Sequence, residues 1–413
     1  MPSKEIMAKM FSAYKYSLVA ISLSSIMLLS AATVQSQTIE EQQSVADPVR
    51  DYMNAIDNVE AEYSAYSTEL SDLYLGLGKS LYSRQEYEKA RQAFQRGMQI
   101  QRVNYGLNSL SQGPYLLSIA DAESFLGNWD ESQEALENLY SINQQAYGAN
   151  DVRMLPVLDQ MLDWYLDSYD ERTPKGGYAN LVISERIATR MYSILEKELP
   201  LDDPEAPERF RRIGYLQYFI ANHIKQHGEP SESGVTFSTG GSASRSEAST
   251  SHMHFRRGKL ALEKVVAATA QQENSSPEDQ AKAVAELGDW YLVFGQRFSA
   301  AQAYQLAYDV LETAEQPEQI RAELFDQPRK INFSMDKDSA SDLALEQMEV
   351  RMTVSAYGVP QGIEVDENTE ISKPQLQALR RNVSNMRFRP RLQNGIAEDA
   401  PYKSLYAVPA PKS

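Results

Sequence analysis

The sequence predicts a mainly α-helical protein, an α-solenoid of about five helix pairs followed by a small α+β domain. Small and large apolar side chains recur at helical spacing between residues 71 and 307, and from about residue 346 the apolar period changes to two. A Ser- and Gly-rich stretch at 228–251 has too few apolar side chains to offset its ordering entropy, so we expect a disordered loop there. These features divide the chain into a signal peptide at 1–36, the helical array at 37–315, a linker at 316–345 and the α+β domain at 346–413.

The N-terminus has the pattern of a secretory signal peptide. Three lysines within the first 15 residues precede an apolar and small-residue run at 17–32, and small residues suitable for cleavage follow at Ala32 and Ser36. The run is shorter than the roughly 20 apolar residues of a membrane span. We therefore expect cleavage and a periplasmic mature chain that does not span the membrane. The alternative is an uncleaved signal that anchors the chain in the inner membrane.

The composition restricts the functional class. The formal net charge of −17 argues against nucleic acid as a partner, because phosphate binding needs a basic face. The absence of cysteine excludes disulfides, thiolate nucleophiles, zinc–cysteine sites and iron–sulfur clusters. The sequence also lacks a nucleophile elbow, a glycine-rich phosphate loop and a His-Glu-x-x-His motif. We therefore expect neither enzymatic activity nor a cofactor.

Residues 71–104 contain the clearest helix pair. Large and small side chains share one face of each helix, with Tyr74, Leu77, Gly78 and Leu81 on the first and Tyr87, Ala90, Phe94 and Gly97 on the second. Two antiparallel helices approach closely only where a small side chain lies at the crossing. The large side chains then fill the layer between the helices.

The same pattern recurs along the chain. It returns 42 residues later with Ala120, Trp129, Ser132 and Leu136 at the matching positions. Further pairs are expected at 155–168 with 178–198, at 206–227 with 252–272, and around Gly288 with Tyr304. This order resembles the tetratricopeptide (TPR) motif, and the long period is similar to the extended variant of kinesin light chains. The resemblance implies a stacked array whose first helices line a groove for a protein or peptide.

The C-terminal region predicts a small α+β domain. Apolar and polar residues alternate along 348–354, as in a half-buried strand, and the chain returns at 363–365 after a turn at 358–362. Ser372 is expected to cap a helix at 373–385. Strands at 386–392 and 402–408 follow, separated by an Asn394-Gly395 turn.

This strand–turn–strand–helix–strand order resembles the C-terminal domain of the TonB family. The resemblance rests on the strand at 348–356, the turn at 358–362, Leu376, Ala378 and Leu379 on the helix, Arg387-Phe388-Arg389-Pro390, and Asn394-Gly395. The resemblance implies a second possible role, as an envelope transport accessory that contacts an outer-membrane receptor.

The first helices of the array supply the candidate partner-binding residues. Projection of the motif places these side chains in the groove: Lys79, Tyr82, Asp121, Phe125, Asp159, Asp163, Asp167 and Asp289. Three of them, Asp159, Asp163 and Asp167, are successive i,i+4 neighbours, and like charges at this spacing repel one another. They are either a binding surface for a basic segment or an ordinary solvated face.

Two further clusters are candidates for binding. Arg387, Arg389 and Arg391 alternate on one expected strand and form a basic face that binds carboxylates or phosphates, docks on the acidic repeats of the same chain, or is simply solvated. His223 and His227 lie at i,i+4 on an expected helix and are weak candidates for a metal site, because zinc needs a third fixed ligand.

Together these patterns predict a non-enzymatic, periplasmic protein–protein interaction scaffold that binds a protein or peptide, such as a cell-envelope protein. The alternatives are the transport accessory and a His-centred metal-binding protein.

Overall fold

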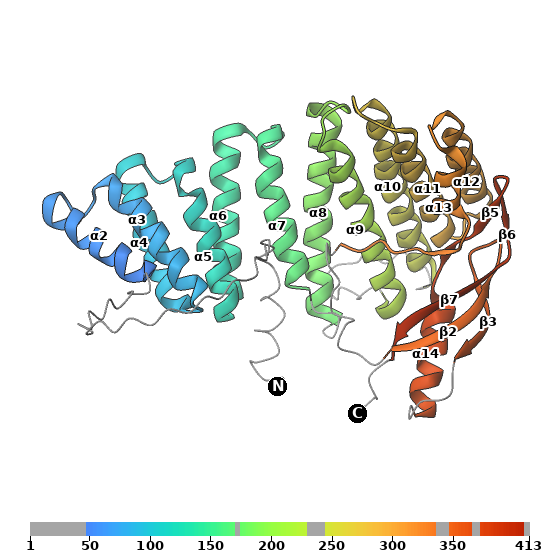
Figure 1. The fold of residues 1–413 in the computed structure, drawn as a ribbon. Helices are drawn as coiled ribbons and strands as arrows, with labels where there is room; N and C mark the ends of the chain where they lie inside the picture. The colour runs from blue at the N-terminus through green and yellow to red at the C-terminus, as the bar shows by residue number, and fades with distance from the viewer. Residues whose placement is uncertain (1–46, 170–173, 229–243, 336–346, 366–371, 409–413) are drawn as a thin grey trace, which may run out of the picture. The chain divides into compact units, whose positions relative to one another are not determined.

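The structure, a computed structural model, describes residues 47–169, 174–228, 244–335, 347–365 and 372–408. The expected signal peptide at 1–36 lies outside these residues. Within them the chain is a helical array followed by a small strand-containing domain (Figure 1), which confirms the fold class expected from the sequence.

The array consists of paired helices that stand side by side in chain order (Figure 1). After α2 (Pro48–Glu62), the described residues form five pairs: α3 (Thr68–Ser83) with α4 (Tyr87–Tyr105), α5 (Gly113–Leu126) with α6 (Trp129–Tyr147), α7 (Leu155–Asp167) with α8 (Pro174–Glu198), α9 (Ala206–His227) with α10 (Ser244–Gln271), and α11 (Pro277–Val293) with α12 (Arg297–Val310). Short 3₁₀ turns η1 (Leu110–Gln112), η2 (Val152–Met154) and η3 (Leu311–Thr313) lie between elements.

Local sequence sets the helix ends. Pro114, Pro156 and Pro277 lie in the first turn of α5, α7 and α11, where a missing N–H costs no hydrogen bond. Gly106 and Gly148 follow the last residues of α4 and α6 with positive φ values of 91° and 88°. The repeated Tyr-Gly dipeptide therefore stops the second helix of the first two pairs.

The small residues of the motif lie where the paired helices cross. A Cβ atom added to Gly78 would collide with the ring of Phe94, and one added to Gly288 would lie 2.6 Å from Cε1 of Tyr304. Phe94 and Tyr304 are themselves buried. Each large ring thus fills the space that a glycine leaves open on the facing helix.

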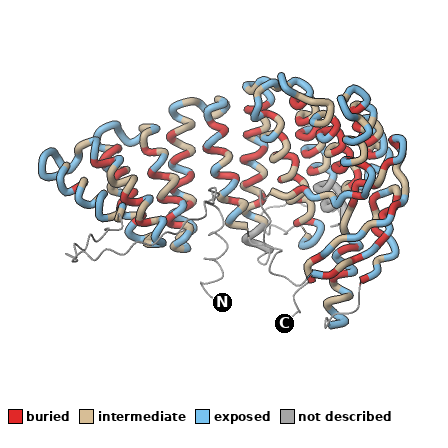
Figure 2. The backbone as a smooth tube through the Cα atoms, viewed as in Figure 1, coloured by how far each residue is buried: buried red, intermediate tan, exposed pale blue. Residues whose placement is uncertain are grey.

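Buried side chains form a nearly continuous core through the array. One cluster extends from Ile56 in α2 to Trp290 in α11, and a second joins α11, α12 and the residues that follow. Figure 2 shows the buried residues on the sides of the helices that face their neighbours. No helix within the described residues is both long enough and apolar enough to cross a membrane.

Two segments differ from the expected boundaries. Helix α10 begins at Ser244, inside the loop expected at 228–251, and residues 229–243 of that loop lie outside the described residues. The expected linker at 316–345 contains α13 (Pro317–Phe325) and β1 (Arg329–Lys330). Leu324, Phe325 and Phe333 are buried, so this part of the chain packs into the fold because it carries large apolar side chains.

The C-terminal domain contains a three-stranded antiparallel sheet. Its strands are β2 (Gln347–Val354), β3 (Pro360–Val365) and β7 (Ala400–Ala407), in the order β3-β2-β7. Alternate residues of β2 are buried, as the period of two predicts. Helix α14 (Lys373–Asn385) packs on this sheet through Leu379 and Val383.

The expected strand at 386–392 is two short strands. β4 (Phe388–Arg389) pairs with β1, and β5 (Arg391–Gln393) pairs with β6 (Ile396–Glu398) through the predicted Asn394-Gly395 turn. Pro390 lies between them and has no N–H to continue a ladder. The chain therefore changes partner at this proline, and β4 joins the segment expected to be a linker.

Candidate partner-binding face

The first helices of successive pairs contact one another through their side chains. We call the surface they share, formed by α3, α5, α7, α9 and α11, the first-helix face. The contacts that join it are Tyr82 with Phe125 at 5.5 Å between ring centroids, Trp164 Nε1 donating to Ser124 Oγ at 2.7 Å, Arg209 with Asp159, and Arg211 Nε with Glu286 Oε1 at 3.1 Å. The groove positions projected from the sequence therefore lie along one series of neighbouring helices.

Three rings form an aromatic cluster between α3, α4 and α5. Tyr87 stacks on Phe125 at 4.7 Å, and Tyr82 meets both rings edge-on at 5.2 and 5.5 Å. Phe125 remains 38% exposed. Large aromatic side chains that stay accessible are typical anchors for protein partners.

Asp121 lies beside this cluster. It precedes Phe125 by one helical turn, so both side chains lie on the same face of α5. The residue is exposed, yet desolvation by the surrounding helices raises the pKa of its carboxyl to about 6. Desolvation, followed by the charge of Asp121, raises the pKa of Tyr82 well above its usual range. In the described part of the chain the Asp121 carboxylate forms neither a hydrogen bond nor an ion pair.

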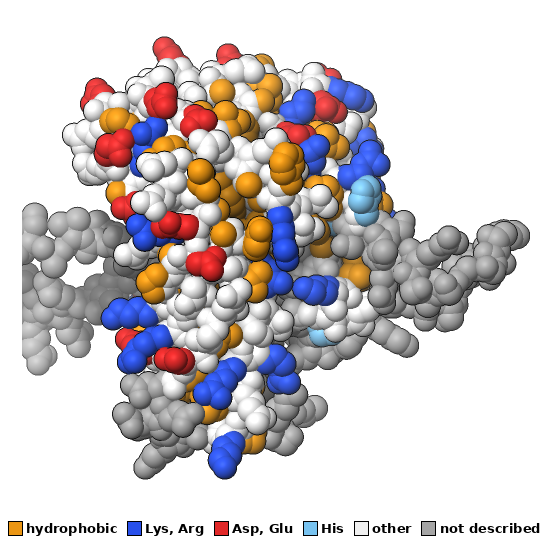
Figure 3. All heavy atoms as spheres, turned by 90° about the vertical axis from the view of Figure 1, so that its right-hand side faces the viewer, with side chains coloured by type: hydrophobic (Ala, Val, Ile, Leu, Met, Phe, Trp, Pro, Cys, Tyr) orange, Lys and Arg blue, Asp and Glu red, His pale blue; other side chains and the backbone are white. Residues whose placement is uncertain are grey.

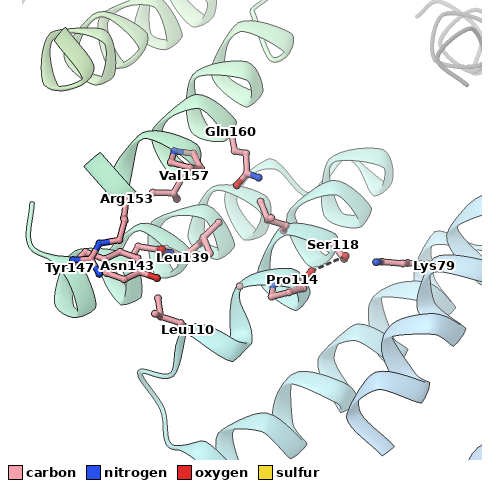
Figure 4. Close-up of a pocket in the computed structure, with 13 residues that line it drawn as sticks. Lys79, Leu110, Pro114, Ser118, Leu139, Asn143, Tyr147, Arg153, Val157 and Gln160 are labelled. Atoms are coloured by element: carbon pink, nitrogen blue, oxygen red, sulfur yellow. Dashed lines mark hydrogen bonds between the residues drawn. The ribbon is translucent and has the colours of Figure 1, made fainter. Parts of the chain in front are cut away.

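A hollow of about 440 Å³ opens between α3, α5, α6 and α7 (Figure 4), and its lining includes Ser118, three residues before Asp121 on α5. Leu110, Leu117, Leu139 and Val157 line its apolar part. Lys79, Asn143, Arg153 and Gln160 supply polar groups. In Figure 4 the Lys79 side chain extends from α3 toward Ser118 of α5. A hollow with apolar walls and a few polar groups suits the side chains of a bound segment.

The acidic stripe on α7 has partners within the chain. Arg209 of α9 bonds Asp159, and Arg212 bonds both Asp159, at 3.2 Å, and Asp163. The interpretation of these carboxylates as a free surface for a basic segment is therefore wrong for Asp159 and Asp163, because α9 already supplies the basic groups. Asp167, one turn further along α7, is exposed.

Asp289 is buried rather than lining an open groove. Its side chain accepts hydrogen bonds from Arg389 Nε at 3.0 Å, Arg389 Nη2 at 2.6 Å and the Tyr304 hydroxyl at 2.9 Å. Burial alone would lower the pKa of Arg389, but the attraction of Asp289 outweighs it and the pKa lies above its usual range. Asp289 and Arg389 are thus each other's partner, which agrees for Arg389 with the expected alternative of docking on the acidic repeats of the same chain.

The three arginines of the C-terminal domain do not form one basic face. Arg389 is buried against Asp289, Arg391 pairs with Glu398 at 3.2 Å, and Arg387 donates to the carbonyl oxygen of Met386 at 2.8 Å. Basic side chains on this end of the protein are interspersed with acidic and hydrophobic ones (Figure 3). The expectation of three parallel guanidinium groups fails because Pro390 breaks the strand that would have aligned them.

The segment after β1 covers the last two first helices. Phe333 is 5% exposed, and its ring lies 5.1 Å from the rings of Tyr215 and Tyr218 on α9 and 5.5 Å from that of Trp290 on α11. The Ile331 N–H donates to the Arg387 carbonyl oxygen at 2.9 Å. The chain's own segment therefore occupies this part of the first-helix face.

The histidine pair is packed among aromatic rings. His223 Nδ1 lies 2.6 Å from the Tyr169 hydroxyl oxygen, and the rings of His223 and His227 are 4.8 Å apart. Within the described residues, no group of three or more His, Asp or Glu side chains is arranged to hold a metal ion. The geometry favours a structural hydrogen bond at His223 over a metal site.

Sequence reasoning missed four residues that shape this face: Tyr87, Arg209, Arg212 and Phe333. For Tyr87, the sequence pattern predicts only a place in the packing between paired helices. The spacing of Arg209 and Arg212 at i,i+3, opposite an acidic stripe one helix earlier, was a signal that could have been used. Phe333 lies in a segment without periodicity, and nothing in the sequence indicated its neighbours.

Comparison with known proteins gives only distant matches. No family model and no curated protein matches the chain. Among solved structures, a protein described as a kinesin light chain of Podosopora anserina with nearly identical TPR-like repeats is 18% identical, with 62% of this chain and 97% of that chain covered and a TM-score of 0.35. BtubC (BKLC) from P. vanneervenii is 13% identical, with 71% and 98% covered and a TM-score of 0.36. The paired helices of the described chain themselves show a helical-repeat fold.

Proposed function

We propose that this protein is a non-enzymatic interaction scaffold that binds a protein or peptide segment on the first-helix face of its first three helix pairs. The proposal rests on one observation: the first-helix face is covered by other parts of the chain at pairs four and five, and it is open at pairs one to three. Pairs four and five are covered by Phe333 and by the Asp289–Arg389 ion pair. Pairs one to three present the aromatic cluster, Asp121 and the hollow of about 440 Å³.

The side chains on the open half suit binding rather than reaction. They are aromatic and apolar groups with a few separated polar groups, without a nucleophile held against a base. Tyr82 and Phe125 offer large contact area at low entropic cost. An extended or helical segment that buries these rings would gain most of its affinity there.

The N-terminal signal pattern supports export and a periplasmic location as part of the proposal. Sequencing the N-terminus of the protein purified from cells tests this part. A start near residue 33 or 37 agrees with a cleaved signal, whereas an intact Met1 would favour the anchored alternative.

A second candidate is the envelope transport accessory suggested by the TonB resemblance. Its support is the sheet order β3-β2-β7, in which β3 and β7 are edge strands that could pair with a segment of a receptor. A variant with proline at Leu405, in the exposed edge strand β7, would weaken receptor binding under this alternative and leave binding at the first-helix face unchanged.

Site-specific photocrosslinking tests the main proposal. A benzophenone amino acid replaces Phe125 in one version of the protein and Phe298, a 76% exposed residue of α12, in a control. We expect a discrete cell-envelope adduct from position 125 that is lost in a Tyr82→Ala background. An equal adduct from position 298, or no adduct from position 125, would contradict the proposed face.

A further inference from the structure

We propose that Asp121 and the aromatic cluster of Tyr82, Tyr87 and Phe125 form a subsite for a cationic side chain, arginine or lysine, of the bound segment. This inference rests on the function proposed above and names the chemistry of the partner at one position.

Several carboxylates along the first-helix face form ion pairs with arginine. Arginine from the same chain meets four acidic residues on α7 and α11: Arg209 meets Asp159, Arg212 meets Asp163, Arg211 meets Glu286 and Arg389 meets Asp289. In the half of this face formed by α7, α9 and α11, arginine side chains thus neutralise several of the carboxylates.

Asp121 on α5 has no such arginine partner in the part of the chain that the structure describes. The neighbouring first helix α7 contains no Lys or Arg, and neither does α5 itself. Lys79 of α3 is the basic residue on the other side, and it extends toward Ser118 without forming an ion pair to Asp121 in the described structure (Figure 4). Asp121 is thus a carboxylate on this face whose cation the described chain does not provide.

The Asp121 carboxylate lies beside the aromatic cluster, close enough for its charge to act on Tyr82. Asp121 stays exposed, but partial desolvation raises the pKa of its carboxyl to about 6. An incoming cation would offset this desolvation and would form a charge-assisted hydrogen bond. The adjacent aromatic rings add a cation–π contribution, to which the planar guanidinium of arginine is well suited.

The complementary reading, an acidic partner attracted by Lys79 and Arg153, has weaker support. Arg153 is already bonded to Asp151 at 2.8 Å and lies over the ring of Tyr147. An acidic side chain at the aromatic cluster would also be repelled by Asp121. Peptides selected for binding would carry a fixed acidic residue if this alternative were correct, and a fixed basic residue if Asp121 binds a cation.

The test is selection of peptides from a randomised 12-residue display library on the mature full-length protein. The expected result is a family of peptides with one fixed Arg or Lys. A synthetic peptide of that family should lose about tenfold in affinity when the basic residue becomes Gln. Asp121→Asn should weaken the parent peptide by a similar factor and should abolish the difference between the Arg and Gln peptides. The control is Asp309→Asn, an exposed carboxylate on α12.

The outcomes separate the two proposals. If the selected peptides lose binding in Phe125→Ala but lack a fixed basic residue, or carry an acidic one, the cation subsite is overturned and the binding face stands. If Asp121→Asn leaves the Arg-to-Gln difference intact, the subsite is again overturned. If no peptide is selected, or if binding survives in Phe125→Ala, the proposed face and the subsite that depends on it both fail.

Discussion

At the scale of single residues, the acidic side chains of the first-helix face have two different environments. Asp289 is 8% exposed and fully engaged by Arg389 and Tyr304, whereas Asp121 is exposed and has no bonding partner in the described part of the chain. The two sequences around them are similar, since both residues follow a small residue at a helix crossing. Their environments differ because only Asp289 faces the C-terminal domain.

Replacement of Asp121 by Asn should stabilise the free protein at pH 7 by about 0.5–1 kcal/mol, after discounting for solvent screening. The folded pKa of about 6 lies above the ordinary value of 3.8, so the folded state binds more protons between these values. The stability of the wild type should therefore fall as pH rises from about 4 to 6, and the variant should lack this part of the pH dependence. Urea unfolding at pH 4 and pH 7 measures the free energy of unfolding of the wild type and of the variant. The same difference between the two proteins at both pH values would contradict the prediction.

Removal of one partner of the buried ion pair should be costly. Asp289→Ala leaves the Arg389 guanidinium buried without its counter-charge, and we expect a loss of about 3–5 kcal/mol. The double variant Asp289→Leu with Arg389→Met should recover much of this loss, because no charge remains buried. Denaturant unfolding compares the two, with Asp309→Ala as the surface control. A double variant as unstable as the single one would show that packing, not charge, dominates.

At the scale of elements, helix pairs are held by a small residue on one helix and a large ring on the other. Gly78 with Phe94 and Gly288 with Tyr304 have the same spacing of 16 residues, and Ala120 with Leu136 repeats it. In the C-terminal domain, a glycine also allows close approach in the turn between β2 and β3, here to the backbone of Phe388. Gly358 has a φ of 69° and its carbonyl accepts the Phe388 N–H at 3.0 Å, so a side chain there would meet both strain and backbone.

Two glycine-to-alanine changes should therefore behave in opposite ways. In Gly78→Ala the new methyl group meets the buried ring of Phe94, and we expect a loss of about 2 kcal/mol despite the better helix propensity of alanine. In Gly113→Ala the nearest atom to the new Cβ is Leu139 Cδ1 at 3.6 Å, an ordinary contact. That variant should be neutral or more stable by up to about 1 kcal/mol. Thermal unfolding measures the midpoint temperature of each variant. Equal shifts in the two variants would contradict the role of Gly78 at the helix crossing.

At the scale of the whole described chain, the last helices share a core with strand β5 of the C-terminal domain, while its three-stranded sheet and α14 form a cluster of their own. Leu392 of β5 packs with Leu324 of α13 and Ala285 of α11, and Phe333 packs between α9 and α11. Strand β4 bonds β1 on one side and reaches Asp289 through Arg389. The C-terminal domain therefore closes the end of the helical array, where a terminal repeat would otherwise expose its apolar face.

Charge reversal at Arg389 should loosen this junction. In Arg389→Glu two carboxylates would face each other in a buried position, and we expect a larger radius of gyration by small-angle scattering. Arg351→Glu, on an exposed side chain of β2, serves as the control. An unchanged radius of gyration in Arg389→Glu, with the protein still folded by circular dichroism, would argue that the other contacts suffice to hold the domain.

Periodicity alone was enough to predict the paired helices, the strand at 348–354 and the helix at 373–385, because spacing along the chain decides which side chains share a face. It also placed Tyr82, Phe125 and Asp121 on the first helices of their pairs, since projection onto one helix needs no knowledge of neighbours. The partners of Asp159, Asp163 and Asp289 and the place of Phe333 depended on folding in three dimensions. They join segments between about 40 and 120 residues apart in the sequence, where local patterns carry no information about which charges and rings will meet.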